Sequence, residues 1–375
     1  MEMSDVAQIN TKQRRDPVLI ACIFLLTGLG LVSLYSSSYA GGLTFIVRQL
    51  IYCAIGICFF IGASFINLEI MRKFTKPLII IALILCGLTF IPGIGVVRNG
   101  ASRWIRLGSN TYQPSELVKL ALPLYLAHIL DKKQGMLEKF STGVLPPVLV
   151  SAAFFALIYF QNNFSTAVFI TINALVIFFL AGIRLRYFIA AAFVFFPVSA
   201  LLLLSKEHRV RRLISFIQPE WEPQRTGYQV KNSIQAIASG GFWGKGIGQG
   251  TRKITSIPEV HSDFIFSAYS EETGFVGVML FVALLALFAV RGYKYALASD
   301  SVFRKLLGAS LVTTIISQAL LNIAVVSGSV PATGVPLPFF SAGGSSLMTT
   351  LICAGLIVNI SRYKGENVFQ ERLYG

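Results

Sequence analysis

The stretch PVLIACIFLLTGLGLVSLYSS, residues 17 to 37, contains no charged side chain. As a helix, an apolar run of this length crosses a bilayer, which takes about 20 residues. About ten such runs follow one another along the chain, and water-soluble folds do not contain such a series. The sequence therefore predicts an all-α polytopic integral membrane protein, with transmembrane helices near residues 17–37, 46–66, 77–95, 114–130, 145–161, 164–181, 187–205, 264–290, 306–327 and 346–361.

Composition points to the same class of protein. Of the 375 residues, 54% are hydrophobic and only 13% are charged, whereas about 25% of a soluble domain is charged. The chain also contains no glycine-rich loop of the kind that binds nucleotide phosphates, and no nucleic acid partner is expected.

The distribution of basic residues predicts the orientation in the membrane. Short cytoplasmic connections of membrane proteins are enriched in Lys and Arg. With the amino terminus inside, more than half of the 32 Lys and Arg residues fall in the connections assigned to the cytoplasm. The first run lacks a small-residue cleavage site, so it is predicted to be retained. We expect one membrane domain over residues 1–375, with cytoplasmic tails at 1–16 and 362–375.

One connection is much longer than the others. Residues 206–263 separate the seventh and eighth predicted spans on the outer side, and a connection of this length is either functional or disordered. Aromatic residues and the segment NSIQAIASGG, predicted as a short amphipathic helix on the membrane, favour an ordered outer loop. The loop carries nine basic residues, and the connection after the third span adds three more: Lys206, Arg209, Arg211, Arg212, Arg225, Lys231, Lys245, Arg252 and Lys253, with Arg98, Arg103 and Arg106.

Two interpretations of these outer cations remain open. They contact the headgroups of anionic membrane lipids, or they bind a phosphorylated ligand, because clustered Arg side chains match the geometry of phosphate. Charge alone does not separate the two.

The segment QPSELVK, residues 113–119, places two charges inside the fourth predicted span. Glu116 and Lys119 are three residues apart and share one helix face. Charges at membrane depth pair with each other or line a hydrated cavity. We therefore expect either an ion pair that packs helices or, as the favoured alternative, a polar cavity open to the outside.

The segment HSDFIF, residues 261–266, places Asp263 immediately before an apolar run. A carboxylate there acts as a general base beside a basic loop, or it is an acidic residue favoured at a helix N-terminus by the helix dipole and by capping. His261 fits a hydrogen-bonding support better than a catalyst.

Three long stretches, at residues 99–127, 227–277 and 326–362, resemble the SEDS proteins, the FtsW/RodA family of bacterial cell-wall glycosyltransferases. The resemblance implies polymerisation of lipid II, a disaccharide-pentapeptide on undecaprenyl diphosphate, into peptidoglycan at the outer face of the plasma membrane. It also implies that Asp263 is the catalytic carboxylate and that Arg103, Glu116 and Lys119 contact substrate. Ser262, His261, Lys245 and Asn163 complete the substrate-binding candidates.

The chain departs from this family after the fifth span. The family has a Pro and then an acidic residue where QNNFSTA, residues 161–167, has Asn162 and Asn163. The amide of Asn163 keeps hydrogen-bonding ability but loses the charge. A divalent cation, Mg²⁺ or Mn²⁺, would suit substrate phosphates, but no residue spacing indicates a metal site.

Several functions remain in competition. The resemblance favours a septal, FtsW-type polymerase over a RodA-type enzyme of side-wall elongation, and it implies a class B penicillin-binding protein (a transpeptidase) as partner, with other divisome or elongasome membrane proteins. A lipid II flippase and a non-catalytic divisome scaffold are the alternatives from other classes. Loss of activity in Asp263→Asn with normal folding would discriminate against both.

Overall fold

We describe a computed structural model of the chain over residues 15–38, 43–98, 100–108, 110–218, 226–250 and 261–363. The cytoplasmic tails predicted at 1–16 and 362–375 lie almost wholly outside these residues. Parts of the predicted outer loop, 219–225 and 251–260, with Arg225, Arg252 and Lys253, also lie outside them.

Each predicted span coincides with a helix. The helices are α1 (Pro17–Ser38), α2 (Leu43–Phe65), α4 (Thr75–Leu88), α5 (Pro114–Lys132), α6 (Leu145–Phe160), α7 (Phe164–Leu180), α8 (Leu185–Leu204), α12 (Ile265–Leu297), α13 (Val302–Val326) and α14 (Gly344–Ile360). Among the described residues, six helices are long and apolar enough to cross a membrane, and α4, α7 and α14 are shorter apolar helices. The protein is thus a polytopic, mainly helical membrane protein.

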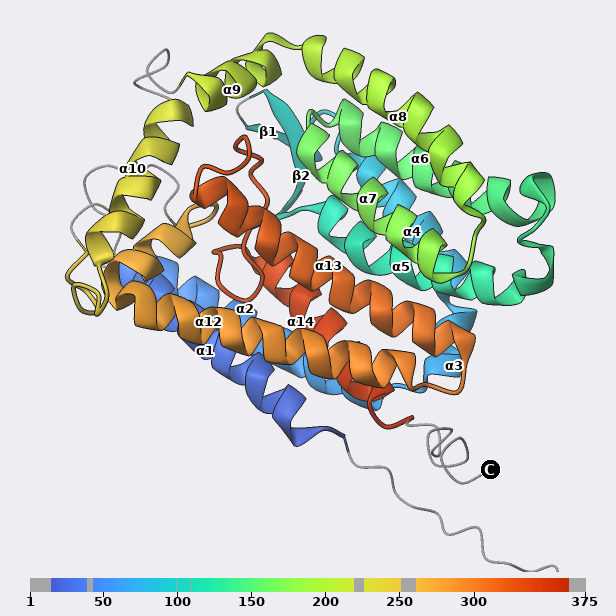
Figure 1. Cartoon of the computed structure of the whole chain (residues 1–375), viewed down its shortest axis with the longest axis horizontal. Coiled ribbons are helices and arrows are strands. Elements are labelled where there is room, and N and C mark those ends of the chain that lie inside the picture. Colours follow the sequence, from blue (N-terminus) through green and yellow to red (C-terminus); the bar gives the residue numbers. More distant parts are fainter. Residues whose placement is uncertain are drawn as a thin grey trace, which may run out of the picture.

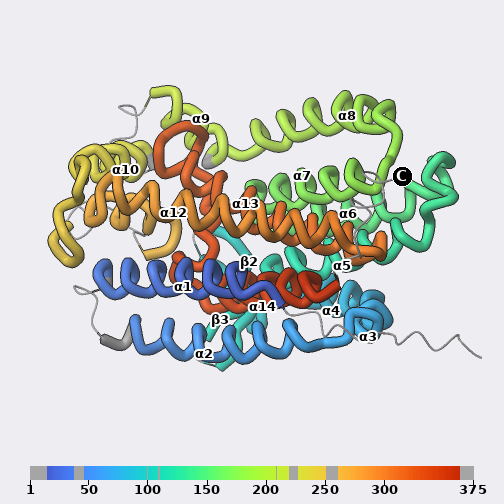
Figure 2. Tube along the Cα trace, turned by 60° about the horizontal axis from the view of Figure 1, so that its bottom comes forward, coloured from blue at the N-terminus to red at the C-terminus, as the bar shows by residue number. Residues whose placement is uncertain are grey.

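Helix α14 lies in the interior and fixes α2. Its residue Asn359 is fully buried, and its Nδ2 donates to the carbonyl oxygens of Ala63 at 2.8 Å and Ile66 at 2.7 Å. Ala63 lies in the last turn of α2 and Ile66 directly follows the helix, where main-chain oxygens lack partners within the helix. Helix α8, by contrast, has no buried residue and lies on the opposite side of the molecule from α2 (Figures 1 and 2).

The connection after α4 forms a small sheet that the sequence analysis did not predict. Strands β1 (Gly95–Arg98), β2 (Ala101–Leu107) and β3 (Asn110–Tyr112) are antiparallel in the order β1-β2-β3, with Val96 opposite Trp104 and Arg106 opposite Thr111. The predicted span 77–95 is therefore too long at its end. Helix α4 stops at Leu88 because Pro92 and Gly93 follow, and Gly93 has a φ of 89°, which does not continue a helix.

The outer connection 206–263 is partly helical. Helix α9 (Glu207–Ile217) follows α8 directly, and α10 (Thr226–Gly240) contains most of the segment predicted as a short helix. Helix α10 packs against α12 and α13, and its Ser233 Oγ donates to the Val326 carbonyl at 2.7 Å. The sequence prediction of a helix here is confirmed.

Helix α12 is interrupted at Gly274, whose φ of 63° and ψ of −163° are not helical. The interruption frees main-chain groups, and residues 241–246, which follow α10, bind them. Phe275 and Val276 donate N–H groups to the carbonyls of Gly241 and Phe242, while Lys245 and Gly246 donate to the carbonyls of Glu271 and Glu272. The glycines of this loop allow two backbones to meet.

Replacing Gly274 by Ala is expected to destabilise the protein by about 3 kcal/mol, because only glycine adopts this backbone conformation without strain. A Cβ there would also lie 2.2 Å from the Gly244 nitrogen. Thermal unfolding in detergent micelles measures the effect. The matched control is Gly28→Ala in α1, where an added Cβ meets nothing within 4 Å. An equal, small shift for both variants would contradict the packing described at the interruption.

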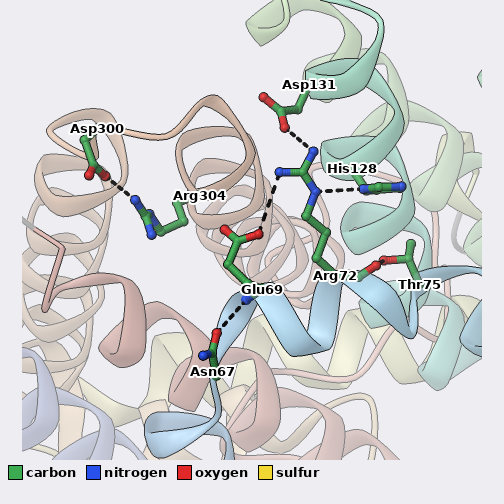
Figure 3. A network of polar contacts seen from close by, with 8 residues as sticks. All are labelled: Asn67, Glu69, Arg72, Thr75, His128, Asp131, Asp300 and Arg304. Carbon is green, nitrogen blue, oxygen red and sulfur yellow. Dashed lines mark hydrogen bonds and ion pairs between the residues drawn. The ribbon is translucent and has the colours of Figure 1, made fainter.

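A network of polar contacts joins three elements at the end of the molecule predicted to be cytoplasmic (Figure 3). Arg72 lies on α3 (Leu68–Lys73), forms an ion pair with Asp131 of α5, and donates from Nε to His128 Nδ1 at 3.0 Å. Its guanidinium also lies over the Phe303 ring of α13. Arg72 therefore ties the short α3 to two membrane helices.

Candidate active site

Asp263 lies directly before α12, at the point where the helix meets the connection between α13 and α14. The N-cap of α12 is Phe264. Asp263 therefore lies one residue before the capping position, the role that the sequence left open for it. Asn322, buried on α13, donates from Nδ2 to the Asp263 carbonyl at 2.9 Å and to the Val335 carbonyl at 2.8 Å. The Asp263 main chain is thereby fixed to α13.

The two preceding residues are fixed in the same way. The Ala342 N–H donates to the His261 carbonyl at 2.8 Å, and Ser341 Oγ donates to the Ser262 carbonyl. Ser341 Oγ in turn accepts from the Leu337 N–H at 2.7 Å. Residues 261 to 263 are therefore all held through main-chain carbonyls, and the chain before α14 supplies two of the three contacts.

Two arginines from different elements lie within electrostatic range of the Asp263 carboxylate. Arg103 comes from β2 and Arg212 from α9, and Asp263 acts on both guanidinium groups electrostatically. Arg212 Nη1 also donates to the Ala332 carbonyl at 3.4 Å. A carboxylate and two cations are thus brought together from three parts of the sequence.

Burial lowers the pKa of both guanidinium groups. Desolvation, with a smaller contribution from the nearby positive charges of Arg212 and Arg209, lowers the pKa of Arg103 to about 10, although Asp263 acts in the opposite direction. Burial lowers the pKa of Arg212 as well, again opposed by Asp263. Arginine side chains stay protonated in proteins, and in this setting an anion gains more from the two cations than it would in water.

Arg212 is a residue that the sequence analysis did not single out from the nine loop cations. Three arginines lie close together in EHRVRRLISFI, and they diverge on α9. Arg209 packs over Tyr159, Arg211 pairs with Glu207, and Arg212 reaches the Ala332 carbonyl, within electrostatic range of Asp263. The helical spacing of RVRR shows that the three point in different directions, but the sequence does not show which of them meets the catalytic candidate.

Glu116 and Lys119 form a buried ion pair on α5. Lys119 Nζ lies 2.7 Å from Glu116 Oε2 and donates to Gln318 Oε1 of α13 at 2.8 Å. The exposed fractions of the two residues are 2% and 5%. Gln318 Nε2 continues the chain of contacts to the Pro336 carbonyl at 2.8 Å. This arrangement matches the helix-packing ion pair, the alternative that the sequence analysis favoured less, while the predicted contact with substrate stays a prediction.

Removing one partner of this pair is expected to destabilise the protein by about 3–5 kcal/mol, because a buried charge then lacks its counter-charge. Lys119→Met and Glu116→Gln are the single variants, and the double variant is expected to be more stable than either. Thermal unfolding in detergent micelles provides the measurement. Additive losses in the double variant would contradict the pairing.

The remaining candidates lie in two further places. Asn163 is the N-cap residue of α7, is only 3% exposed, and has an Nδ2 with no hydrogen-bond partner among the described residues. Lys245 Nζ lies 2.6 Å from Glu271 Oε1. Glu271 is on α12, about two helical turns beyond Asp263. The structure therefore brings Arg103 to Asp263 and places Lys245 beside the interruption of α12.

The described residues contain no group of three or more His, Cys, Asp or Glu side chains that could hold a metal ion. Asp263 has two guanidinium groups within electrostatic range, and a divalent cation prefers several oxygen ligands. The donor set around Asp263 therefore does not fit a cation held by these side chains alone.

Comparison with known proteins shows the family to which this chain belongs. The family model FtsW/RodA/SpoVE, described as cell cycle protein, matches residues 16–366. This chain belongs to that family. A relative in Geobacter sulfurreducens, named probable peptidoglycan glycosyltransferase FtsW, is 37% identical over 95% of this chain and 98% of its own. The stage V sporulation protein E of Bacillus subtilis is 33% identical over 94% of this chain and 98% of its own.

Two solved structures share the fold. A chain from a study of how a peptidoglycan synthase complex coordinates polymerization and crosslinking matches with a TM-score of 0.80 and 26% identity, over 94% of this chain and 99% of that chain. The rod shape determining protein RodA of Thermus thermophilus matches with a TM-score of 0.71 and 26% identity, over 94% and 98%.

Proposed function

We propose that this protein is a peptidoglycan glycosyltransferase that polymerises lipid II into glycan strands. The observation that carries the proposal is the meeting of Asp263 with Arg103 and Arg212 in a chain of this family. Glycosyl transfer needs a base for the proton of the attacking hydroxyl and positive charge for the departing group. One carboxylate and two cations provide both.

The reaction then proceeds in one displacement. The 4-hydroxyl of the acceptor sugar attacks the anomeric carbon of the donor, and the bond from that carbon to the diphosphate oxygen breaks. Asp263 accepts the hydroxyl proton, while the undecaprenyl diphosphate leaves with the bonding electrons. Arg103 and Arg212 stabilise the charge that develops on the diphosphate, and no step is assigned to a metal ion.

We further propose a septal role in the plasma membrane, with the site on its outer face. Relatives named FtsW over nearly the whole chain support the septal branch over side-wall elongation. The match to a chain of a peptidoglycan synthase complex supports a partner penicillin-binding protein of class B. The exposed apolar side chains of α8, among them Phe193 and Phe196, suit contact with lipid or with a membrane partner.

Polymerisation of purified lipid II tests the proposal. The protein is reconstituted with its penicillin-binding partner, whose crosslinking site is inactivated, and glycan length is read on gels. Long strands are expected. Movement of lipid II across the vesicle membrane without strand formation would instead establish a flippase. A folded protein that shows neither transport nor polymerisation would be a scaffold.

A further inference from the structure

The turn between α6 and α7 has an unusual backbone at Asn162, whose φ is 59°. Side chains other than glycine rarely take this left-handed conformation, and Asn is among the few that tolerate it. Among the described residues, Phe339 is the one other non-glycine with a positive φ. Such a conformation persists only where its surroundings hold it.

Asn162 contacts the hairpin of β1 and β2 through both its side chain and its main chain. Its Nδ2 donates to the Gly100 carbonyl at 2.7 Å, where the hairpin turns. Its own carbonyl accepts a hydrogen bond from Arg103 Nη2. One residue of the α6–α7 turn thus binds the hairpin at two points, three residues apart.

The second contact determines where the Arg103 guanidinium lies. Arg103 experiences the positive charges of Arg212 and Arg209 as well as the negative charge of Asp263. A neutral carbonyl acceptor lets the guanidinium stay beside other cations, since a hydrogen bond to a charged donor is stronger than one between neutral groups. Because the carbonyl direction follows the backbone angles, the left-handed conformation of Asn162 aims this acceptor.

We propose that Asn162 is a positioning residue, which holds the Arg103 guanidinium toward Asp263 through its left-handed main-chain carbonyl. This inference rests on the proposed function, because its kinetic tests measure the polymerisation of lipid II. It also explains why the position suits Asn: proline has a φ fixed near −65° and does not adopt the turn seen here.

A set of substitutions separates the backbone from the side chain. Asn162→Gly keeps the positive φ and the carbonyl and loses only the bond to Gly100, so kcat/KM for lipid II is expected to fall by no more than about threefold. Asn162→Ala strains the turn and is expected to lower kcat/KM by about tenfold. The control is Asn67→Ala, an exposed N-cap at the other end of the molecule, with an expected rate near that of wild type. Equal losses in the Gly and Ala variants would overturn the role of the left-handed backbone.

A double-mutant cycle tests whether Asn162 acts through Arg103. In the Arg103→Lys background, Asn162→Ala is expected to lower kcat/KM by less than about twofold, because the guanidinium that Asn162 positions is already absent. The same loss in both backgrounds, with thermal unfolding unchanged, would overturn the proposal.

A chemical readout keeps the test independent of polymerisation. Arg103 is expected to react about fivefold faster with phenylglyoxal in Asn162→Pro than in wild type. Proline keeps a main-chain carbonyl, but its fixed φ turns this carbonyl away from the guanidinium, which loses its acceptor. Peptide mass spectrometry follows Arg103, with the more exposed Arg211 as internal reference. Unchanged reactivity of Arg103 would overturn the positioning role even in a protein without measurable polymerisation, and a wild type that makes no glycan would count against the proposed function alone.

Discussion

Asp263→Asn is expected to lower the rate of glycan polymerisation by about 1,000-fold, because the amide does not accept the proton of the attacking hydroxyl. The substitution is nearly isosteric and leaves in place the hydrogen bond from Asn322 to the main-chain carbonyl of residue 263, so folding is expected to be preserved. Initial rates with purified lipid II and thermal unfolding provide the two measurements. The variant tests the base directly, without a change in side-chain size.

The matched control is Asp300→Asn, which removes an exposed carboxylate paired with Arg304 at the other end of the protein (Figure 3). Its polymerisation rate is expected to stay near that of wild type. Full activity in Asp263→Asn would assign the base to another residue, and equal losses in both variants would indicate a general defect of the protein.

Arg212→Ala is expected to lower kcat for polymerisation by about 100-fold, because the charge developing on the departing diphosphate loses one preorganised cation. Arg211→Ala removes a cation from the same helix, one residue earlier, where the side chain pairs with Glu207. Surface ion pairs of this kind contribute little, so this variant is expected to keep nearly full activity. The two arginines are neighbours on α9, but the helix points their side chains in different directions.

The outcome separates the two interpretations of the outer cations. Contact with lipid headgroups depends on the number of charges, so both variants would then lose similar, small fractions of activity. A large loss confined to Arg212 would support a ligand site. Similar rates for the two variants would contradict the assignment of Arg212.

The apolar runs predicted the helices well, because a span must be long and free of charge whatever its neighbours are. The strands at residues 95–112 were not predicted, since short strands outside the membrane have no such requirement. The third span was predicted too long because Phe90, Ile91 and Ile94 are apolar, although the helix has already ended at Leu88. Hydropathy alone does not register a backbone turn.

The site was predictable in part. HSDFIF and QPSELVK identified Asp263, Glu116 and Lys119 by residue type and resemblance, but the partner of Lys119 on α13 is Gln318, almost 200 residues away. The same limit applies to Arg212, which the loop sequence does not distinguish from Arg211. Contacts between distant segments depend on helix packing, and one sequence does not specify them.

The interruption of α12 at Gly274 has a mechanical consequence. Four main-chain hydrogen bonds join residues 241–246 to both sides of the interruption, and leaving these groups without partners costs about 1–3 kcal/mol for each. Two of these bonds lie before Gly274 and two lie beyond it, so residues 241–246 brace the interruption and resist bending of α12 at this point. Because α10 leads directly into residues 241–246, it is coupled to both parts of α12, and a load applied to α10 is shared along the whole helix instead of bending it at Gly274.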